Sequence, residues 1–188
     1  RTGVRKDGTI LADEVTLYAD TGAYINLGPA QLLKAAAHCC GPFQVPNLKV
    51  DGYLVFTNTL NGSAMRGMGV PQSCFAWESH LDLIAERLGI HPLELRRKNM
   101  FGTKGTLPNG QVVDAAPARE TLERAVALFQ SSPSPPLRPR KKRGVGMAAM
   151  IYPHDSCGVS GATSVFLKVD SDGSAVLYSG LSDVGQGS

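Results

Sequence analysis

The sequence lacks several features that would each point to a particular class of protein. Its four cysteines include no pair in a Cys-x-x-Cys spacing, which argues against an iron–sulfur cluster or structural zinc site held by this chain alone. No apolar run approaches the length of a membrane span, and no signal-peptide pattern opens the chain. The adjacent Cys39 and Cys40 are predicted to be small buried thiols. Reduced thiols favour a cytoplasmic protein.

Charge is also limited, since charged residues make up 19% of the 188 residues and the net charge is +3. Much of this excess comes from residues 138–143, which follow a Pro-rich stretch. Such a local run is typical of a solvated linker, so no nucleic-acid partner is expected. The hydrophobic fraction of 43% is that of a globular protein.

Glycine is plentiful, and the most informative glycine-rich stretch is Ala-Met-Arg-Gly-Met-Gly-Val-Pro-Gln at residues 64–72. It lies between a β-like run and a helix-like run. Glycine allows a backbone to approach a ligand closely, and the N-terminus of a helix offers unpaired N–H groups. The sequence therefore predicts a loop that holds an anionic, oxygen-rich group. A second glycine loop, at residues 180–187, follows another predicted strand.

Turn signals and apolar periodicity predict an α+β fold made of two mixed α/β pieces. Residues 1–130 form the first piece, residues 131–143 a Pro-rich basic linker, and residues 144–188 the start of a second domain. Helices are expected over residues 31–40, 72–88, 91–98 and 121–129, strands over 10–19, 45–57, 144–151, 162–169 and 174–179, a hairpin turn over 170–173 and a loop over 101–110.

On the long helix, Phe75 is expected to join the apolar face with Leu81. Glu78 and Asp82 lie four residues apart, and with Arg87 nearby they are expected to form a solvated face.

Three blocks in order resemble the large, molybdopterin-binding subunit of the xanthine dehydrogenase and aldehyde oxidase family of molybdenum hydroxylases. They are residues 57–72, Glu-Leu-Arg-Arg-Lys-Asn-Met at 94–100, and Gly-Leu-Ser-Asp-Val-Gly-Gln-Gly-Ser at 180–188. The resemblance covers nearly the whole chain. It implies a part of a larger subunit, spanning the end of one cofactor-binding domain and the start of the next. Both ends of the chain are accordingly expected to be cuts.

The resemblance also implies a cofactor site formed by the two glycine loops. The first loop would lie against the molybdenum centre and pterin, and the second would bind the pyranopterin or its phosphate. No side chain is expected to ligate the metal directly. The residues concerned are Met65, Arg66, Gly67 and Met68 in the first loop, and Gly185, Gln186 and Gly187 in the second.

For the substrate pocket, the resemblance implies Lys34, His38 and Met68. Lys34 stands where xanthine-oxidising members carry an arginine that touches substrate. A lysine keeps the charge but loses the planar fork, which points away from a strict purine enzyme. The residues themselves leave two alternatives open, a solvated Lys34 at a helix rim and an ordinary hydrogen-bonded core His38. Further along the chain, Tyr152, His154 and Ser156 fall near the family's pocket segment.

The activity implied is oxidation of an aldehyde, heteroaromatic or acyl carbon, with oxygen taken from water. Electrons would leave through iron–sulfur and FAD units on other domains or subunits. The family's Gly-Gly-Gly-Phe-Gly-Gly loop and its glutamate base are not found in this sequence, so the catalytic residue is unknown and the isolated chain is expected to be inactive. Two alternatives remain open: a non-enzymatic phosphate- or nucleotide-binding module, and an inactive structural fragment.

Overall fold

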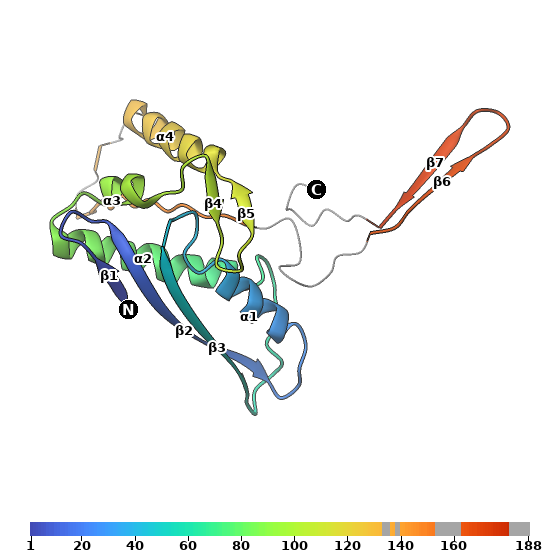
Figure 1. The fold of residues 1–188 in the computed structure, drawn as a ribbon, viewed down its shortest axis with the longest axis horizontal. Coiled ribbons are helices and arrows are strands. Elements are labelled where there is room, and N and C mark those ends of the chain that lie inside the picture. Colours follow the sequence, from blue (N-terminus) through green and yellow to red (C-terminus); the bar gives the residue numbers. More distant parts are fainter. Residues whose placement is uncertain (133–135, 138–139, 153–162, 181–188) are drawn as a thin grey trace. The chain divides into compact units, whose positions relative to one another are not determined.

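The computed structural model describes residues 1–132, 136–137, 140–152 and 163–180. They belong to two compact units, Arg1–Ile151 and Tyr152–Ser188. Each helix and each strand belongs to one of the two units. The combination of helices with small sheets confirms the α+β class (Figure 1). In the part of the chain described, the helices are too short or too polar to cross a membrane.

The first unit contains a three-stranded sheet in the order β1-β2-β3. β1 (Thr2–Val4) runs antiparallel to β2 (Ile10–Gly22), whereas β2 and β3 (Asn47–Phe56) run parallel. A parallel pair needs a crossover connection, and α1 (Gly28–Ala37) supplies it. The carboxyl ends of β2 and β3 consequently lie at the same edge of the sheet, with α1 beside them (Figure 1).

The rest of the first unit is mainly helical. The predicted long helix is α2 (Val70–Leu88), and the short helix after it is α3 (Pro92–Asn99). A small hairpin of β4 (Lys104–Thr106) and β5 (Val112–Asp114) precedes α4 (Ala116–Ser131). The prediction of a loop over 101–110 was therefore wrong at β4, because a three-residue strand is too short to show alternation.

The described part of the second unit is a hairpin of β6 (Val165–Val169) and β7 (Ala175–Ser179). Its turn is closed by Gly173 N–H donating to the Asp170 carbonyl oxygen at 3.0 Å, which confirms the predicted turn over 170–173. The strand predicted over 144–151 was wrong. That segment is irregular, and Met147 and Ala149 pack instead against the core of the first unit.

The core of the first unit is formed where α2 and α3 pack against the sheet and the turn after α1. Cys39 and Cys40 are both buried in it, as predicted. Phe75, by contrast, is 76% exposed. It precedes the buried Trp77 by two residues, which places it about 200° round the helix from the core. The buried cluster consists of Ile10, Cys39, Cys40, Phe43, Trp77, Leu81, Ile84, Ala85, Leu93, Leu95, Met100 and Leu122.

The solvated face predicted for α2 was wrong at Glu78. This carboxylate is only 5% exposed because Arg96 of α3, itself fully buried, binds it. Arg96 donates from Nε to Glu78 Oε2 and from Nη1 to Asp82 Oδ1, both at 2.7 Å. Burial raises the pKa of Glu78, while the charge of Arg96 lowers it. The pairing fixes α2 against α3.

Candidate functional site

The first glycine loop, Ala64–Gly69, connects the segment after β3 to the N-terminus of α2. Its last three residues adopt the left-handed region in succession, with φ of 73° at Gly67, 43° at Met68 and 88° at Gly69. This conformation is ordinary for glycine but strained for methionine. The surrounding structure must therefore hold Met68 in place.

Two close contacts show how the end of this loop is held. A Cβ added to Gly69 would lie 2.4 Å from the carbonyl oxygen of Gln31 and 3.2 Å from the Cβ of Ala35, both in α1. A Cβ added to Gly67 would lie 2.4 Å from Pro71 Cγ. Both positions thus require glycine, and α1 is the element against which the loop is packed.

The backbone of the loop presents hydrogen-bond donors. In the part of the chain that the structure describes, no backbone N–H from Ser63 to Gly69 donates to another protein group. The next one, Val70 N–H, donates to the Gly67 carbonyl oxygen at 3.1 Å and starts α2. Successive N–H groups in a left-handed or turn conformation form an anion-binding concavity, and a helix N-terminus adds positive potential. The loop therefore fits an oxygen-rich, anionic cofactor.

The side chains of the loop face solvent to different degrees. Met65 is 90% exposed, Arg66 is exposed, and Met68 is half-buried. An exposed guanidinium beside free backbone donors can pair with a phosphate in the bidentate manner that lysine cannot match. The loop thus offers one positive side chain in addition to its backbone.

The two other pocket residues proposed from the sequence lie on α1 and at its C-terminal end. Lys34 is half-buried, and His38 is 1% exposed with Nδ1 hydrogen-bonded to the Lys34 carbonyl oxygen at 3.0 Å. Because Gln31 and Ala35 of the same helix contact Gly69, Lys34 belongs to the element that supports the loop. The bond to Lys34 also fits an ordinary core role for His38.

The remaining predicted site residues lie outside the described part of the chain. They are His154 and Ser156 of the proposed pocket segment and Gly185, Gln186 and Gly187 of the second glycine loop. Tyr152 is described and is half-buried. The roles given to all of these residues stay predictions.

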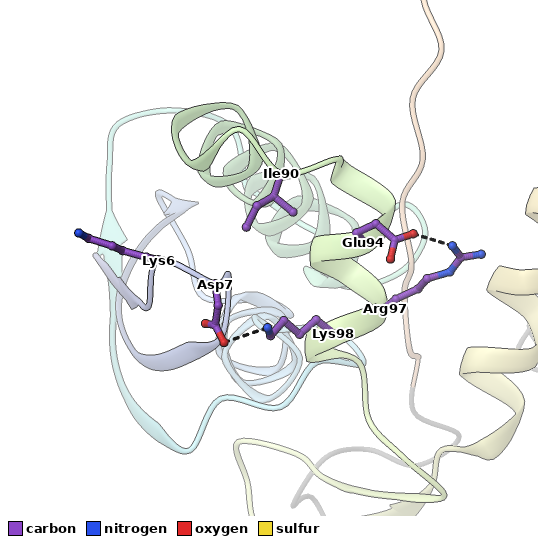
Figure 2. A pocket seen from close by; sticks show the side chains of 6 residues that line it. All are labelled: Lys6, Asp7, Ile90, Glu94, Arg97 and Lys98. Atoms are coloured by element: carbon purple, nitrogen blue, oxygen red, sulfur yellow. Dashed lines mark hydrogen bonds and ion pairs between the residues drawn. The ribbon is translucent and has the colours of Figure 1, made fainter.

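A cavity of about 530 Å³ lies at the opposite end of α2 from the loop. Figure 2 shows two ion pairs in its lining, Lys98 with Asp7 at 2.9 Å and Arg97 with Glu94 at 2.7 Å. The 19 residues of α2 separate it from the glycine loop by about 28 Å. Carboxylates neutralise Lys98 and Arg97, which leaves Lys6 as the lining cation that makes no ion pair among the described residues. Its lining consists of Lys6, Asp7, Ile90, Glu94, Arg97 and Lys98.

Sequence reasoning missed the residues that bond the segment after β3 to the end of β2, chiefly Asp20 and Gly62. The strand predicted over residues 10–19 stopped short of Asp-Thr-Gly at 20–22, which belongs to β2. An aspartate two residues before a glycine at the carboxyl end of a strand was the available signal, because such a side chain accepts bonds from nearby backbone and hydroxyl groups. Among the described residues, no three His, Cys, Asp or Glu side chains are placed to hold a metal ion.

Comparison with known families identifies the kind of domain that contains this loop. The model of the molybdopterin cofactor-binding domain matches residues 1–100, which include α1, the whole first glycine loop and α2. The chain belongs to the molybdopterin cofactor-binding domain family. The resemblance seen in the sequence is thereby confirmed.

Individual relatives of this molybdopterin cofactor-binding domain support the same family assignment. The large molybdopterin subunit of nicotinate dehydrogenase from Eubacterium barkeri is 40% identical over 126 residues, which are 66% of this chain and 30% of that protein. Aldehyde oxidoreductase from Megalodesulfovibrio gigas is 33% identical over 188 residues, 97% of this chain and 20% of that protein.

The fold also matches a solved structure, aldehyde oxidoreductase from Desulfovibrio desulfuricans. The TM-score is 0.78 at 30% identity, and the match covers 92% of this chain and 19% of that one. The chain thus spans less than a third of the length of these relatives.

Proposed function

We propose that this chain is part of the molybdopterin-binding subunit of a molybdenum hydroxylase. The whole protein would oxidise an aldehyde, heteroaromatic or acyl carbon with oxygen derived from water. One observation carries the proposal: the family match includes a loop, Ser63–Gly69, whose backbone N–H groups have no partner among the described residues. Bound molybdopterin would supply a redox-active metal that accepts two electrons from the substrate carbon.

In the first glycine loop, the backbone would bind the cofactor and the side chain of Arg66 would balance its charge. The N–H groups of Met65, Arg66, Gly67 and Met68 would donate to oxygens of the pterin or its phosphate, and the guanidinium of Arg66 would balance negative charge. From the second loop, Gly185, Gln186 and Gly187 would provide close approach and an amide that both donates and accepts.

In the substrate pocket, Lys34, His38 and Met68 would act together. The ammonium of Lys34 would attract an electron-rich or negatively charged part of the substrate. His38 would fix the end of α1 through its bond to the Lys34 carbonyl oxygen, and so would orient Lys34 from a buried position. Met68 would present a flexible apolar wall, suited to a broader range of substrates than a rigid ring.

The other components follow from the same proposal. The remainder of the molybdopterin subunit would complete the pocket and provide the catalytic base. Iron–sulfur and flavin units on other domains or subunits would carry electrons away from a small-molecule substrate. The rival hypothesis, a phosphate- or nucleotide-binding module, explains the glycine loop but not the family match, and we therefore favour molybdopterin.

The decisive experiment measures cofactor content. The complete polypeptide is produced in a host that makes molybdopterin, and its molybdenum is measured by mass spectrometry and its pterin by fluorescence after oxidation. We expect both in stoichiometric amounts, and we expect Gln186→Ala to lower both by about tenfold, since it removes contacts to a charged group. Gln130→Ala, at an exposed position of α4, is the matched control and should retain full content.

Two outcomes would contradict the proposal. Wild-type protein without molybdenum and pterin would exclude it. Copurification of a nucleotide in place of the pterin, unaffected by Gln186→Ala, would support the rival module.

A further inference from the structure

Two loops are joined where the parallel strands β2 and β3 end. Thr57 N–H donates to the Gly22 carbonyl oxygen at 3.1 Å, and Gly62 N–H donates to the Thr21 carbonyl oxygen at 3.0 Å. In the reverse direction, Ala23 N–H donates to the Thr59 carbonyl oxygen at 3.1 Å. The segment after β3 is thereby bonded, over several residues, to the last two residues of β2 and to the residue that follows them.

A single carboxylate lies within this junction. Asp20 Oδ1 accepts from the Thr57 hydroxyl and from Gly22 N–H, both at 2.7 Å. Asp20 Oδ2 receives a longer bond of 3.4 Å from the Thr59 hydroxyl, which itself lies 2.8 Å from the Thr57 hydroxyl. The bonds from Thr57 and Gly22 lower the pKa of Asp20, so this side chain is ionised at neutral pH.

The two segments also approach each other too closely for side chains. A Cβ added to Gly22, whose φ is 75°, would lie 2.3 Å from the Leu60 carbonyl oxygen. A Cβ added to Gly62 would lie 2.6 Å from the Asp20 carbonyl oxygen. Gly62 lies two residues before Ala64, where the glycine loop begins. The loop is therefore attached at one end to this junction and at the other, through Gly69, to α1.

We propose that Asp20 is a positioning residue for the cofactor loop. No N–H from Ser63 to Gly69 bonds within the described protein, and the carbonyl oxygens of Gly67 and Gly69 accept from Val70 N–H and Ser73 N–H at the start of α2. The conformation of the rest of the loop therefore depends on its two attachments. Asp20 determines the attachment at the β3 end by orienting Thr57 and Thr59, the residues from which the chain leads into the loop. The inference rests on the proposed function for its role, but the order it gives to the loop is a property of the protein alone.

A matched control exists at the other end of β2. Asp7 accepts from Lys98 Nζ at 2.9 Å and from Thr9 N–H and the Thr9 hydroxyl, both at 3.1 Å, and these bonds lower its pKa. It thus shares with Asp20 the bonds to a nearby N–H and hydroxyl, and adds an ion pair, in a turn that leads to no glycine loop. The complete polypeptide is prepared as Asp20→Ala, Asp20→Asn and Asp7→Ala.

Two measurements are made on each variant: molybdenum content, and amide hydrogen exchange in cofactor-free protein at Thr57 and Gly62, whose N–H groups bond across the junction. We expect Asp20→Ala to lower molybdenum content about fivefold and to speed exchange about fivefold, the equivalent of one ordinary hydrogen bond. Asp20→Asn, which keeps one oxygen acceptor, should fall between, and Asp7→Ala should match the wild type in both measurements.

The two measurements separate the two claims. If Asp20→Ala leaves exchange at Thr57 and Gly62 unchanged, or if Asp7→Ala changes it equally, Asp20 does not position the loop. If the wild type contains no molybdenum but Asp20→Ala still speeds exchange, the positioning role stands and the proposed cofactor is wrong.

Discussion

The two ends of α2 satisfy their polar groups in opposite ways. Towards its C-terminal half, Arg96 donates to the Glu78 carboxylate, to Asp82, and to the carbonyl oxygens of Glu78 and Pro92. At its N-terminus, the loop Ser63–Gly69 leaves its N–H groups without partners in the described protein. A buried guanidinium whose nitrogens are all bonded rigidifies a fold, whereas donors held in place without partners are suited to bind a ligand. The first region is structural and the second is the candidate site.

The largest effect is expected from removing the buried guanidinium of Arg96. Arg96→Ala leaves the buried carboxylate of Glu78 without its partner, and the free energy of unfolding should fall by about 3–5 kcal/mol. Chemical denaturation would measure it. Arg87→Ala, at an exposed position of the same helix end, should change it by less than about 0.5 kcal/mol. Similar losses for both variants would mean that Arg96 is not the main link between α2 and α3.

Glycine substitutions at the two ends of α2 give the sharpest comparison. Gly69 and Gly89 flank the helix and are both left-handed, with φ of 88° and 65°. Only Gly69 lies against another element, since nothing lies within 4 Å of a Cβ added to Gly89. Gly89→Ala should lower stability by about 1 kcal/mol through backbone strain alone. Gly69→Ala should lower it by about 2–3 kcal/mol, because overpacking against α1 is added.

Thermal or chemical denaturation of both variants would test this difference. Molybdenum content should fall only for Gly69→Ala. Equal losses of stability would show that the contact between the loop and α1 is not tight.

A substitution of Met68 is expected to raise stability instead of lowering it. Met68→Gly removes a side chain from a residue with φ of 43°, and relief of strain should raise the free energy of unfolding by about 1 kcal/mol. Under the proposed function, the same variant should alter substrate preference in a steady-state assay of the complete enzyme. Loss of stability would instead show that the packing of the methionine outweighs its strain.

The smallest effect concerns pH. Hydrogen bonds from Lys98 and Thr9 lower the pKa of Asp7 from 3.8 to about 2. A carboxylate with a lowered pKa in the folded state adds stability that is fully present above its ordinary pKa and is lost as the pH falls through the lowered value. Asp7→Asn should therefore flatten the pH dependence of stability between about pH 4 and pH 2. An unchanged pH dependence of stability would mean that the pKa of Asp7 is the same in the folded and the unfolded chain.

The elements that the sequence predicted best are those whose cause is local. The helix from residue 72 was found within two residues of its start, because apolar periodicity and Gly89 mark it without help from the rest of the fold. The glycine loop was found because its composition is unusual within a few residues. Both signals are contained in one short window.

The failures share a different cause. Glu78 was expected at the surface because its partner, Arg96, lies 18 residues away on another helix. Residues 144–151 were expected to be a strand because they are small and apolar, but a strand also needs a neighbour to bond, and periodicity cannot supply one. The contacts of Gly69 with α1 and of Asp20 with Thr57 likewise depend on tertiary structure, so Gly69 was placed in the loop without its neighbour and Asp20 was missed.

The parallel pairing of β2 with β3 has a consequence for how specificity can change. The chain must return along the outside of the sheet through α1, and that return segment carries Lys34 and abuts Gly69. A one-residue insertion in it would rotate Lys34 by about 100° and shift it by about 1.5 Å, while the two strand ends stayed in register. Under the proposed function, variation in the crossover helix would therefore change the position of Lys34 and the support of the glycine loop together, because Gln31 and Ala35 of the same helix lie against Gly69.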